Sequence, residues 1–259
     1  MKEISIITVV RNDKKGLRNT YNSLRESLSD QIEWVIIDGK SNDGTLEVIQ
    51  ELPSSYLKWI SEIDKNMYDA MNKGIKKSSG RYLLFLNAGD ILKKNLSDIN
   101  IESQSSDLIF YNIEKLDANY NKIYWRLPRN FLNQISEKPI VPHQSTFIKR
   151  DVFDKVGLYN DEFVYLGDYD FFCRVVCNEK NKFKYKYFLG CTIASFVCNG
   201  ITFNYRYSLR LMKECMQIQK KYFNRTNKTM RILYIFKYLS SYMPGHLLLA
   251  NHIRKFLKN

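Results

Sequence analysis

A single carboxylate follows an apolar run in the first hundred residues. Residues 83–90 read LLFLNAGD, so Asn87 and Gly89 stand between a strand-like segment and Asp90. Asn, Gly and Asp are residues that end strands in turns, and a turn is the simplest interpretation of this segment. The alternative is that Asp90 belongs to a ligand site, and the residues that follow other strands bear on this choice.

Polar side chains also follow three other strand-like segments, 4–10, 33–38 and 57–60. In a parallel sheet flanked by helices, ligands bind at the carboxyl ends of the strands. Polar side chains that converge on this edge therefore indicate a nucleotide or metal site. Besides Asn87 and Asp90, the residues at these strand ends are Arg11, Asn12, Asp13, Asp38, Gly39, Asp64 and Lys65.

The second half of the chain adds two carboxylates and a histidine. Asp168 and Asp170 lie in the first turn of a predicted helix over 168–178, where Asp168 could serve only as a cap. His143 stands at the start of a predicted strand over 143–150 and could contact an acceptor or a diphosphate, with a structural role as the alternative. We find no Ser–His–Asp or Cys–His pattern that would indicate a covalent mechanism.

Alternating strands and helices would position the residues at the strand ends. The alternation continues to residue 86, and Asn66 is placed to cap a helix over 67–77. That helix contains Tyr68 and Asp69, which could line a donor pocket or serve only in packing and capping. The order βαβαβαβ predicts a doubly wound, mainly parallel sheet.

After residue 100 the alternation weakens. Here the pattern predicts further strands, together with two helices, the first of which ends at Gly157. The strands are expected over 107–116, 121–127, 143–150, 182–188 and 191–197, and the helices over 151–157 and 168–178.

Composition limits the class of protein. The chain has 259 residues, of which 44% are hydrophobic, so it can bury a large core. Its five cysteines form no CxxC pair, which favours buried thiols in a reducing compartment over disulfides or a zinc site. The first residues read as a strand and not as a signal peptide, and no apolar run reaches the roughly 18 residues of a membrane span. A cytosolic protein, or one lying on a membrane surface, is expected.

Positive charge is concentrated at the C-terminal end. The formal net charge is +13, and residues 205–259 contain twelve Lys or Arg against one acid, Glu214. These residues also show helical patterns in which cations are mixed with Leu, Ile, Phe and Tyr. Such helices bind anionic membrane surfaces, although a solvated helical bundle is the alternative. We therefore divide the chain into a domain over 1–204 and a basic amphipathic tail over 205–259.

Four segments resemble the successive motifs of family 2 glycosyltransferases, which have the GT-A fold. They are SIITVVRND, EWVIIDGKSNDGT, SEIDKNMYDAMNKGIKKSSGRYLLFLNAGD and HQSTFIKRDVFDKVGLYNDEFVYLGDYDFFCR. Their order and spacing agree with the family over about residues 3–204, and they are most similar to bacterial enzymes of surface-polysaccharide assembly. The resemblance implies a GT-A, Rossmann-like, mixed and mainly parallel α/β sheet.

This resemblance implies roles for particular residues. Asp38 would hold the nucleotide, with Arg11, Asp64 and Lys65 as further donor-binding residues. Gly39 stands where many members have a second aspartate. Gly200 resembles a glycine of the family's loop near the acceptor, although a simple turn is the default. His246 and His252 lie in the tail, and no chemistry is assigned to them.

The family's DxD-type metal motif is altered in this chain. Asn87 replaces its first aspartate and Gly89 its second, which leaves Asp90 as the expected ligand of Mn²⁺ or Mg²⁺. Such a cation needs only one or two protein carboxylates when phosphates supply the other ligands. Asp168 occupies the place of the family's catalytic base, whereas Asp170 and His143 are candidates on the acceptor side.

The sequence therefore predicts an inverting, metal-dependent glycosyltransferase. It would move a sugar from a nucleotide-sugar, with a UDP-sugar favoured, to a lipid-linked oligosaccharide at the cytoplasmic face of a bacterial membrane. A catalytically weak or silent nucleotide-sugar binding module is one alternative, because the metal motif is altered. A nucleic-acid-binding protein is a less favoured alternative; the basic residues lie among apolar ones on membrane-like helices, so no nucleic acid is expected.

Overall fold

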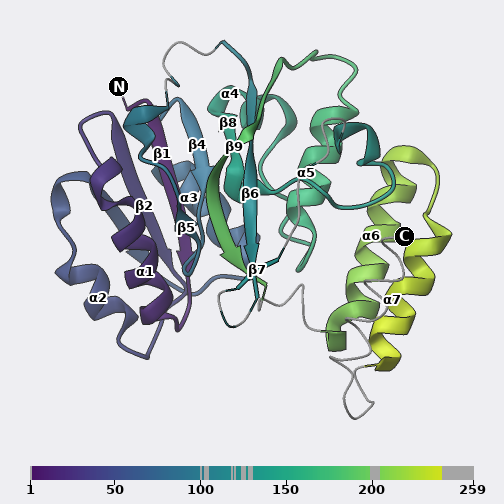
Figure 1. Cartoon of the computed structure of the whole chain (residues 1–259), viewed down its shortest axis with the longest axis horizontal. Coiled ribbons are helices and arrows are strands. Elements are labelled where there is room, and N and C mark those ends of the chain that lie inside the picture. The colour runs from purple at the N-terminus through teal and green to yellow at the C-terminus, as the bar shows by residue number, and fades with distance from the viewer. Residues whose placement is uncertain are drawn as a thin grey trace.

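The computed structural model describes residues 2–99, 101, 105–117, 119, 121–123, 127, 131–198 and 205–240. One mixed sheet crosses the molecule, with the strand order β3-β2-β1-β4-β8-β6-β9-β5 and β7 paired to β6 (Figure 1). The predictions for Gly200, His246, His252 and the last tail helix lie outside the described residues.

The first half of the sheet is parallel, as the alternating pattern predicts. Strands β1, β2, β3 and β4 pair in parallel in the order β3-β2-β1-β4. Asn66 caps α3 through its Oδ1 atom, which accepts hydrogen bonds from the backbone N–H groups of Tyr68 and Asp69. The elements are β1 (Ile4–Val10), α1 (Lys14–Leu24), β2 (Ile32–Asp38), α2 (Thr45–Glu51), β3 (Leu57–Ser61), α3 (Met67–Lys77) and β4 (Tyr82–Phe85).

The second half makes the sheet mixed. Strand β8 pairs antiparallel with both β4 and β6, and β9 pairs parallel with β6. Helix α4 is followed at its C-cap by Gly157, whose φ of +85° is one that glycine adopts readily. The elements are β5 (Ile91–Leu92), β6 (Leu108–Leu116), β7 (Lys122–Ile123), β8 (Thr146–Lys149), α4 (Arg150–Val156), α5 (Gly167–Val176) and β9 (Tyr185–Val197).

The prediction of two separate strands over 182–188 and 191–197 is wrong. Residues 185–197 form the single strand β9, which spans 13 residues, and residues 182–184 precede it. Its pairing with β6 shifts register, because Tyr111 pairs with Phe188 whereas Asn112 pairs with Thr192. The irregularity takes up the extra residues around Gly190, so that the strand continues where the sequence suggested a break. The short strand β5, which pairs with β9, was not predicted.

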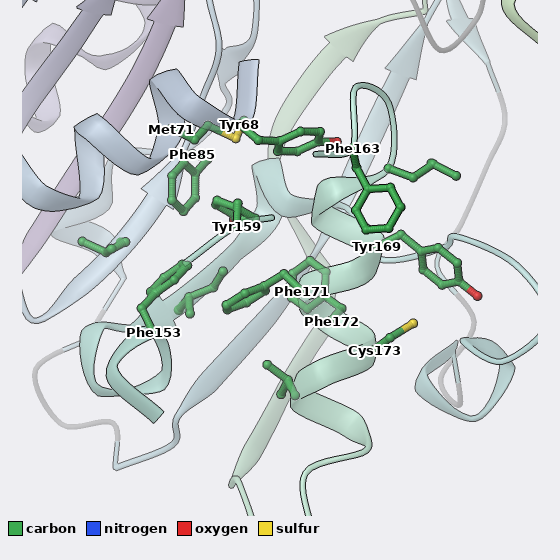
Figure 2. Packing of buried hydrophobic residues seen from close by; sticks show 14 of the residues in the cluster. Tyr68, Met71, Phe85, Phe153, Tyr159, Phe163, Tyr169, Phe171, Phe172 and Cys173 are labelled. Atoms are coloured by element: carbon green, nitrogen blue, oxygen red, sulfur yellow. The ribbon is translucent and has the colours of Figure 1, made fainter. Parts of the chain in front are cut away.

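Helices cover both faces of the sheet (Figure 1). On one face, α1 and α2 bury Leu17, Leu24, Val48 and Ile49 in a cluster with Trp34. On the other face, α3, α4 and α5 enclose an aromatic cluster, and Figure 2 shows Tyr68, Tyr159 and Phe171 among its members. This second core supports the start of α5, where Asp168 lies.

Of two C-terminal helices, the first packs beside α5 and the second packs beside the first (Figure 1). They are α6 (Ser208–Phe223) and α7 (Lys228–Ser240). Leu211, Cys215 and Ile218 of α6 belong to the same buried cluster as Phe172 of α5. The boundary drawn at residue 204 therefore does not separate two cores, because α6 completes the core of the preceding residues.

Two properties of the chain bear on its surroundings. Among the described residues, no helix has the length and hydropathy needed to cross a membrane. Cys173 and Cys215 are buried core residues, whereas Cys177, Cys191 and Cys198 are only half-buried. Burial raises the pKa of the Cys215 thiol to about 12, which keeps it in the neutral form expected of a core residue.

Candidate active site

Asp38 ends strand β2 with a fully buried carboxylate. Its oxygens accept hydrogen bonds from Ser41 Oγ at 2.5 Å and from Ser61 Oγ at 2.6 Å. The backbone N–H of Ser41 also lies 3.2 Å from Asp38 Oδ2. A buried carboxylate is retained where hydrogen bonds replace its hydration, and these bonds hold the turn that follows β2. In this structure Asp38 stabilises the turn after β2, at the edge of the sheet where nucleotide binding was predicted.

The ends of β1, β2 and β3 bring Arg11, Gly39 and Asp64 together. A methyl group added to Gly39 would lie 3.0 Å from Asp64 Oδ2 and 3.2 Å from Arg11 Cδ. Asp64 accepts a hydrogen bond of 2.7 Å from Lys73 Nζ, an atom that also contacts Glu62 at 2.9 Å. Burial raises the pKa of Asp64 above its usual value, although Lys73 opposes this. Two of the predicted donor-binding residues are therefore neighbours.

Lys73 is a site residue that the sequence analysis missed. It lies on α3, four residues after Asp69, and its Nζ atom is 3.4 Å from Asp69 Oδ2. Burial lowers the pKa of Lys73, but the bonds to Asp64 and Glu62 outweigh burial and raise it. The i,i+4 spacing from Asp69 was the available signal.

Lys65 is exposed and pairs with another loop. Its Nζ atom lies 2.8 Å from Glu162 Oε1 and 3.3 Å from Asp161 Oδ1. These hydrogen bonds raise the pKa of Lys65 above its usual value. In this structure Lys65 joins the start of α3 to the segment before Asp168, and it is not engaged with Arg11 or Asp64.

The segment after β4 forms a tight turn around Asp90. Gly89 has a φ of +91°, and Asp90 Oδ2 accepts a hydrogen bond of 2.9 Å from the backbone N–H of Asn87. The turn interpretation is thus correct for the backbone. Asp90 is 7% exposed, and burial raises the pKa of its carboxyl to about 7 despite the opposing effect of His143. The turn therefore holds a carboxyl that can change its charge near neutral pH.

Asp168 is held by side chains from two other elements. Tyr68 Oη lies 3.0 Å from Asp168 Oδ1, and His143 Nδ1 lies 3.1 Å from Asp168 Oδ2. Burial, and then the charge of Asp168, raise the pKa of Tyr68 well above its usual value, so its hydroxyl keeps the proton that it donates. The Asp168 side chain remains 20% exposed, so a small molecule can reach it.

Close packing brings Tyr68 to the start of α5. A methyl group added to Gly167 would lie 2.7 Å from Tyr68 Cδ2, which is too close for any real side chain. Glycine at this position therefore lets the tyrosine ring approach the helix that carries Asp168. Tyr68 packs in the aromatic cluster on its other sides (Figure 2).

His143 is near both the Asp90 turn and Asp168. It bonds to Asp168 and is near enough to lower the pKa of Asp90. Within the described part of the chain, His143 Nε2 and Asn87 Oδ1 are buried without a hydrogen-bond partner. Buried polar atoms are usually paired, so two such atoms beside two carboxylates indicate a place for a polar ligand.

Asp170 does not join this group of residues. Its buried carboxylate accepts hydrogen bonds from Arg174 Nε at 2.9 Å and from Tyr222 Oη at 2.8 Å. It thus points from α5 toward α6, because two residues along a helix turn a side chain away from its neighbour. The prediction of an acceptor-side role for Asp170 is not supported by this position.

A comparison with known families adds to the geometry. The model of the family described as Glycosyl transferase family 2 matches residues 5–157, which is more than half of the chain. The chain belongs to glycosyl transferase family 2. Of the residues in the candidate site, the matched segment includes Asp38, Asp90 and His143, whereas Asp168 lies beyond it.

Curated relatives of this family 2 glycosyltransferase include mycobacterial proteins. An uncharacterized glycosyltransferase of Mycobacterium tuberculosis is 27% identical over 207 residues, which cover 76% of each chain. A PGL/p-HBAD biosynthesis glycosyltransferase of Mycobacterium bovis is 28% identical over 182 residues, covering 67% of this chain and 70% of the relative.

Solved structures confirm the predicted GT-A fold of this family 2 glycosyltransferase. S. aureus TarS in complex with UDP has a TM-score of 0.61 and 17% identity, covering 86% of this chain and 71% of that chain. The mannosyltransferase PcManGT from Pyrobaculum calidifontis, in complex with GDP-Man and Mn²⁺, has a TM-score of 0.64 and 14% identity. It covers 96% of this chain and 73% of that one.

The residues around Asp90 fit a divalent cation whose other ligands are oxygen atoms of a diphosphate. Asp90 supplies a carboxylate, and Asn87 Oδ1 is a buried oxygen atom that no described residue contacts by a hydrogen bond. Among the described residues, no group of three or more His, Cys, Asp or Glu side chains could hold a metal on its own. Mg²⁺ and Mn²⁺ bind such sites through one or two carboxylates together with phosphate oxygens.

Proposed function

We propose that this protein is an inverting glycosyltransferase that transfers a sugar from a UDP-sugar to a hydroxyl group of a lipid-linked glycan. The observation that carries the proposal is the placement of His143, which bonds to Asp168 and lies beside Asp90. Two carboxyl groups near one imidazole match the two tasks of the reaction. One task is to hold the leaving diphosphate, and the other is to accept a proton from the incoming hydroxyl.

Asp168 is the proposed base. Tyr68 and His143 each direct a donor at one of its oxygens, so the carboxylate is fixed in place while its side chain stays 20% exposed. In a direct displacement, Asp168 accepts the proton of the acceptor hydroxyl as that oxygen bonds to the anomeric carbon of the sugar. The bond from that carbon to the diphosphate breaks on the opposite side, which inverts the configuration.

The donor side is assigned to the edge formed by β1, β2, β3 and β4. Arg11, Asp38, Asp64 and Lys65 are the proposed nucleotide-binding residues, with Asn87 near the diphosphate. The neighbouring positions of Arg11, Gly39 and Asp64 support this assignment for three strand ends. The UDP and UDP-GlcNAc complexes of S. aureus TarS support the choice of a UDP-sugar.

Asp90 and Asn87 are the residues proposed to hold Mn²⁺ or Mg²⁺. A bound cation would offset negative charge on the diphosphate as it leaves. The Mn²⁺ complex of PcManGT supports a role for a metal in this fold.

The acceptor is proposed from the surface of α7. Ile232, Ile235, Phe236 and Leu239 are exposed and recur at helical spacing, so they form one apolar face. Lys228 and Arg231 are exposed on the same helix, which suits an anionic lipid surface. An enzyme held at the cytoplasmic face of a bacterial membrane meets a lipid-linked acceptor there.

Transfer from labelled nucleotide-sugars tests the proposal. UDP-GlcNAc, UDP-glucose and GDP-mannose are incubated with the protein, Mn²⁺ and a bacterial lipid extract, and the label in the lipid fraction is counted. The wild-type protein should label lipid from one donor, and Asp168→Asn should lower the rate by a factor of about 10² to 10⁴ while UDP still binds. Full activity of Asp168→Asn would refute the assigned base. Donor binding without transfer would favour the nucleotide-sugar binding module.

A further inference from the structure

Glu214 is the single acidic residue between positions 205 and 259. It lies on the side of α6 that faces the segment before α5, where its carboxylate contacts the backbone of Leu166. Its carboxylate accepts three hydrogen bonds from consecutive backbone N–H groups. Glu214 Oε1 lies 2.9 Å from Val164 N, and Oε2 lies 3.0 Å from both Tyr165 N and Leu166 N. The one carboxylate of this cation-rich segment thus binds backbone N–H groups of residues 164–166.

The three N–H groups lie directly before helix α5. That helix begins at Gly167, and its first turn contains Asp168. The residue that precedes it, Leu166, has no side chain that could cap the helix. Backbone N–H groups at a helix start lack partners within the helix, and a carboxylate there is favoured by the helix dipole. Of the three N–H groups, only that of Leu166, the N-cap residue, belongs to the start of the helix, so Glu214 mainly fixes the backbone that leads into α5.

A second contact ties α6 to the same helix. Tyr222 Oη donates a hydrogen bond of 2.8 Å to Asp170 Oδ1, and Lys221 Nζ lies 3.7 Å from that oxygen. Leu211, Cys215 and Ile218 bury their side chains in the core cluster that includes Phe172. Helix α6 thus forms hydrogen bonds with the segment before Asp168 and with Asp170 after it. It also packs against α5 through apolar side chains.

The segment before Asp168 is also held from the opposite side. Asn66 Nδ2 donates a hydrogen bond of 2.7 Å to the carbonyl oxygen of Asp161, and Tyr68 Oη lies 3.0 Å from the carbonyl oxygen of Tyr165. Residues 161–166 therefore lie between α3 and α6. The α3 side supplies Tyr68, which contacts Asp168 itself, whereas Glu214 contacts only the backbone.

We propose that Glu214 is a positioning residue for the transferase reaction. It holds the backbone of residues 164–166 so that Asp168 stays within hydrogen-bonding distance of Tyr68 and His143. This inference rests on the proposed role of Asp168 as the base. If Glu214 has this role, α6 contributes to the active site although it lies beyond the matched family segment.

Three variants on α6 test the proposal. Glu214→Ala removes all three hydrogen bonds, Glu214→Gln keeps an acceptor oxygen, and Gln217→Ala is the control because Gln217 is exposed on the same helix. The first measurement is amide hydrogen exchange over peptides covering 163–170. The second is the ¹⁵N resonance of the His143 ring, whose Nδ1 atom reports the bond to Asp168. Both measurements are independent of turnover.

We expect Glu214→Ala to speed exchange at residues 164–166 at least tenfold and to shift the His143 resonance. Glu214→Gln should give smaller changes and Gln217→Ala none. With the donor identified by the transfer screen, Glu214→Ala should lower kcat by about 10- to 100-fold and leave the Kd for UDP within twofold, because displacement of a base affects turnover more than binding. An unchanged His143 resonance and unchanged kcat in a folded Glu214→Ala protein would overturn the proposal.

A double variant separates this inference from the proposed function. If Glu214 acts through Asp168, adding Glu214→Ala to Asp168→Asn should cause no further loss of kcat, so the two effects are not additive. An additive loss would show that Glu214 acts by another route and overturn the inference alone. Full activity of Asp168→Asn would instead refute the proposed base, and with it the inference.

Discussion

Tyr68 and His143 fix the orientation of the Asp168 carboxylate. Each donates to a different oxygen of the carboxylate, and the backbone N–H of Tyr169 also bonds to Asp168 Oδ1 at 2.9 Å. The geometry leaves the carboxylate little freedom to rotate. At the scale of single residues, the site is therefore arranged by hydrogen bonds to one acidic side chain.

Removal of the Tyr68 hydroxyl should reduce both turnover and stability. Tyr68→Phe retains the ring in the aromatic cluster and removes the hydroxyl, which lies 3.0 Å from both Asp168 Oδ1 and the carbonyl oxygen of Tyr165. We expect kcat to fall about tenfold and the free energy of unfolding to fall by about 1.5–3 kcal/mol, the usual cost of one hydrogen bond to a charged group. Steady-state kinetics and urea unfolding measure the two effects. Unchanged kcat with lowered stability would assign Tyr68 to packing alone.

The buried carboxyl of Asp90 should make stability depend on pH. Its pKa is about 7 in the folded protein, against an unfolded value near 3.8, so the folded state binds the extra proton. The resulting contribution to stability is complete below pH 3.8 and is lost as the pH rises through 7. In EDTA, the free energy of unfolding should fall by roughly 2–3 kcal/mol between pH 5 and pH 8 because of this group.

Asp90→Asn is the matched control for this pH effect, because the amide has nearly the same shape and does not titrate. Urea unfolding at several pH values should show a flatter profile for the variant. Mn²⁺ should also raise the Tm of the wild-type protein more at pH 8 than at pH 6, since the ligand must be deprotonated. An identical pH profile for both proteins would contradict the buried position of Asp90.

At the scale of elements, the N-terminus of α3 joins two parts of the site. Asn66 caps α3 through Oδ1, and its Nδ2 atom donates to carbonyl oxygens of the segment before Asp168. Asn66→Ala removes both functions and should lower the free energy of unfolding by about 1–2 kcal/mol. Asn66→Asp keeps the acceptor and should retain the cap.

Urea unfolding of these two Asn66 variants separates capping from the contact to residues 161–163. The Asp variant should keep most of the helix-capping stability, yet it should exchange amide hydrogens faster in residues 161–166. If Asn66→Asp and Asn66→Ala lose equal stability, the cap contributes little, and the contact with the loop is the main role of Asn66.

At the scale of the whole molecule, the helix pair α6 and α7 has one buried side and one exposed side. One side of α6 is fixed in the core by Leu211, Cys215 and Ile218. The exposed side of α7 carries the apolar face of Ile232, Ile235, Phe236 and Leu239. The tail therefore contributes to the core through α6 and exposes apolar side chains on α7.

Polar substitutions on α7 should weaken binding to anionic vesicles. The paired change Ile232→Ser and Phe236→Ser should reduce sedimentation with phosphatidylglycerol vesicles at least tenfold, because two exposed apolar side chains are lost from the surface. Thr229→Ala, an exposed position on the same helix, serves as the control. Equal binding by all three proteins would refute membrane docking through this face.

Local patterns in the sequence determined the first half of the fold. The bounds predicted for β1 and α3 agree with the structure, and Asn66 caps α3 as expected. Apolar periodicity and caps are properties of neighbouring residues, so they can be recognised without tertiary contacts. The positions of Asp38, Asp64 and Asp90 at strand ends follow from the same patterns.

Only the tertiary structure decided which polar groups meet. Tyr68 and Asp168 are 100 residues apart, and the Glu214 carboxylate reaches Leu166 across 48 residues. The continuity of β9 depends on its pairing with β6, and the orientation of Asp170 depends on where α6 packs. Such contacts result from the packing of distant elements into a shared core, and a pattern confined to neighbouring residues carries no record of that packing.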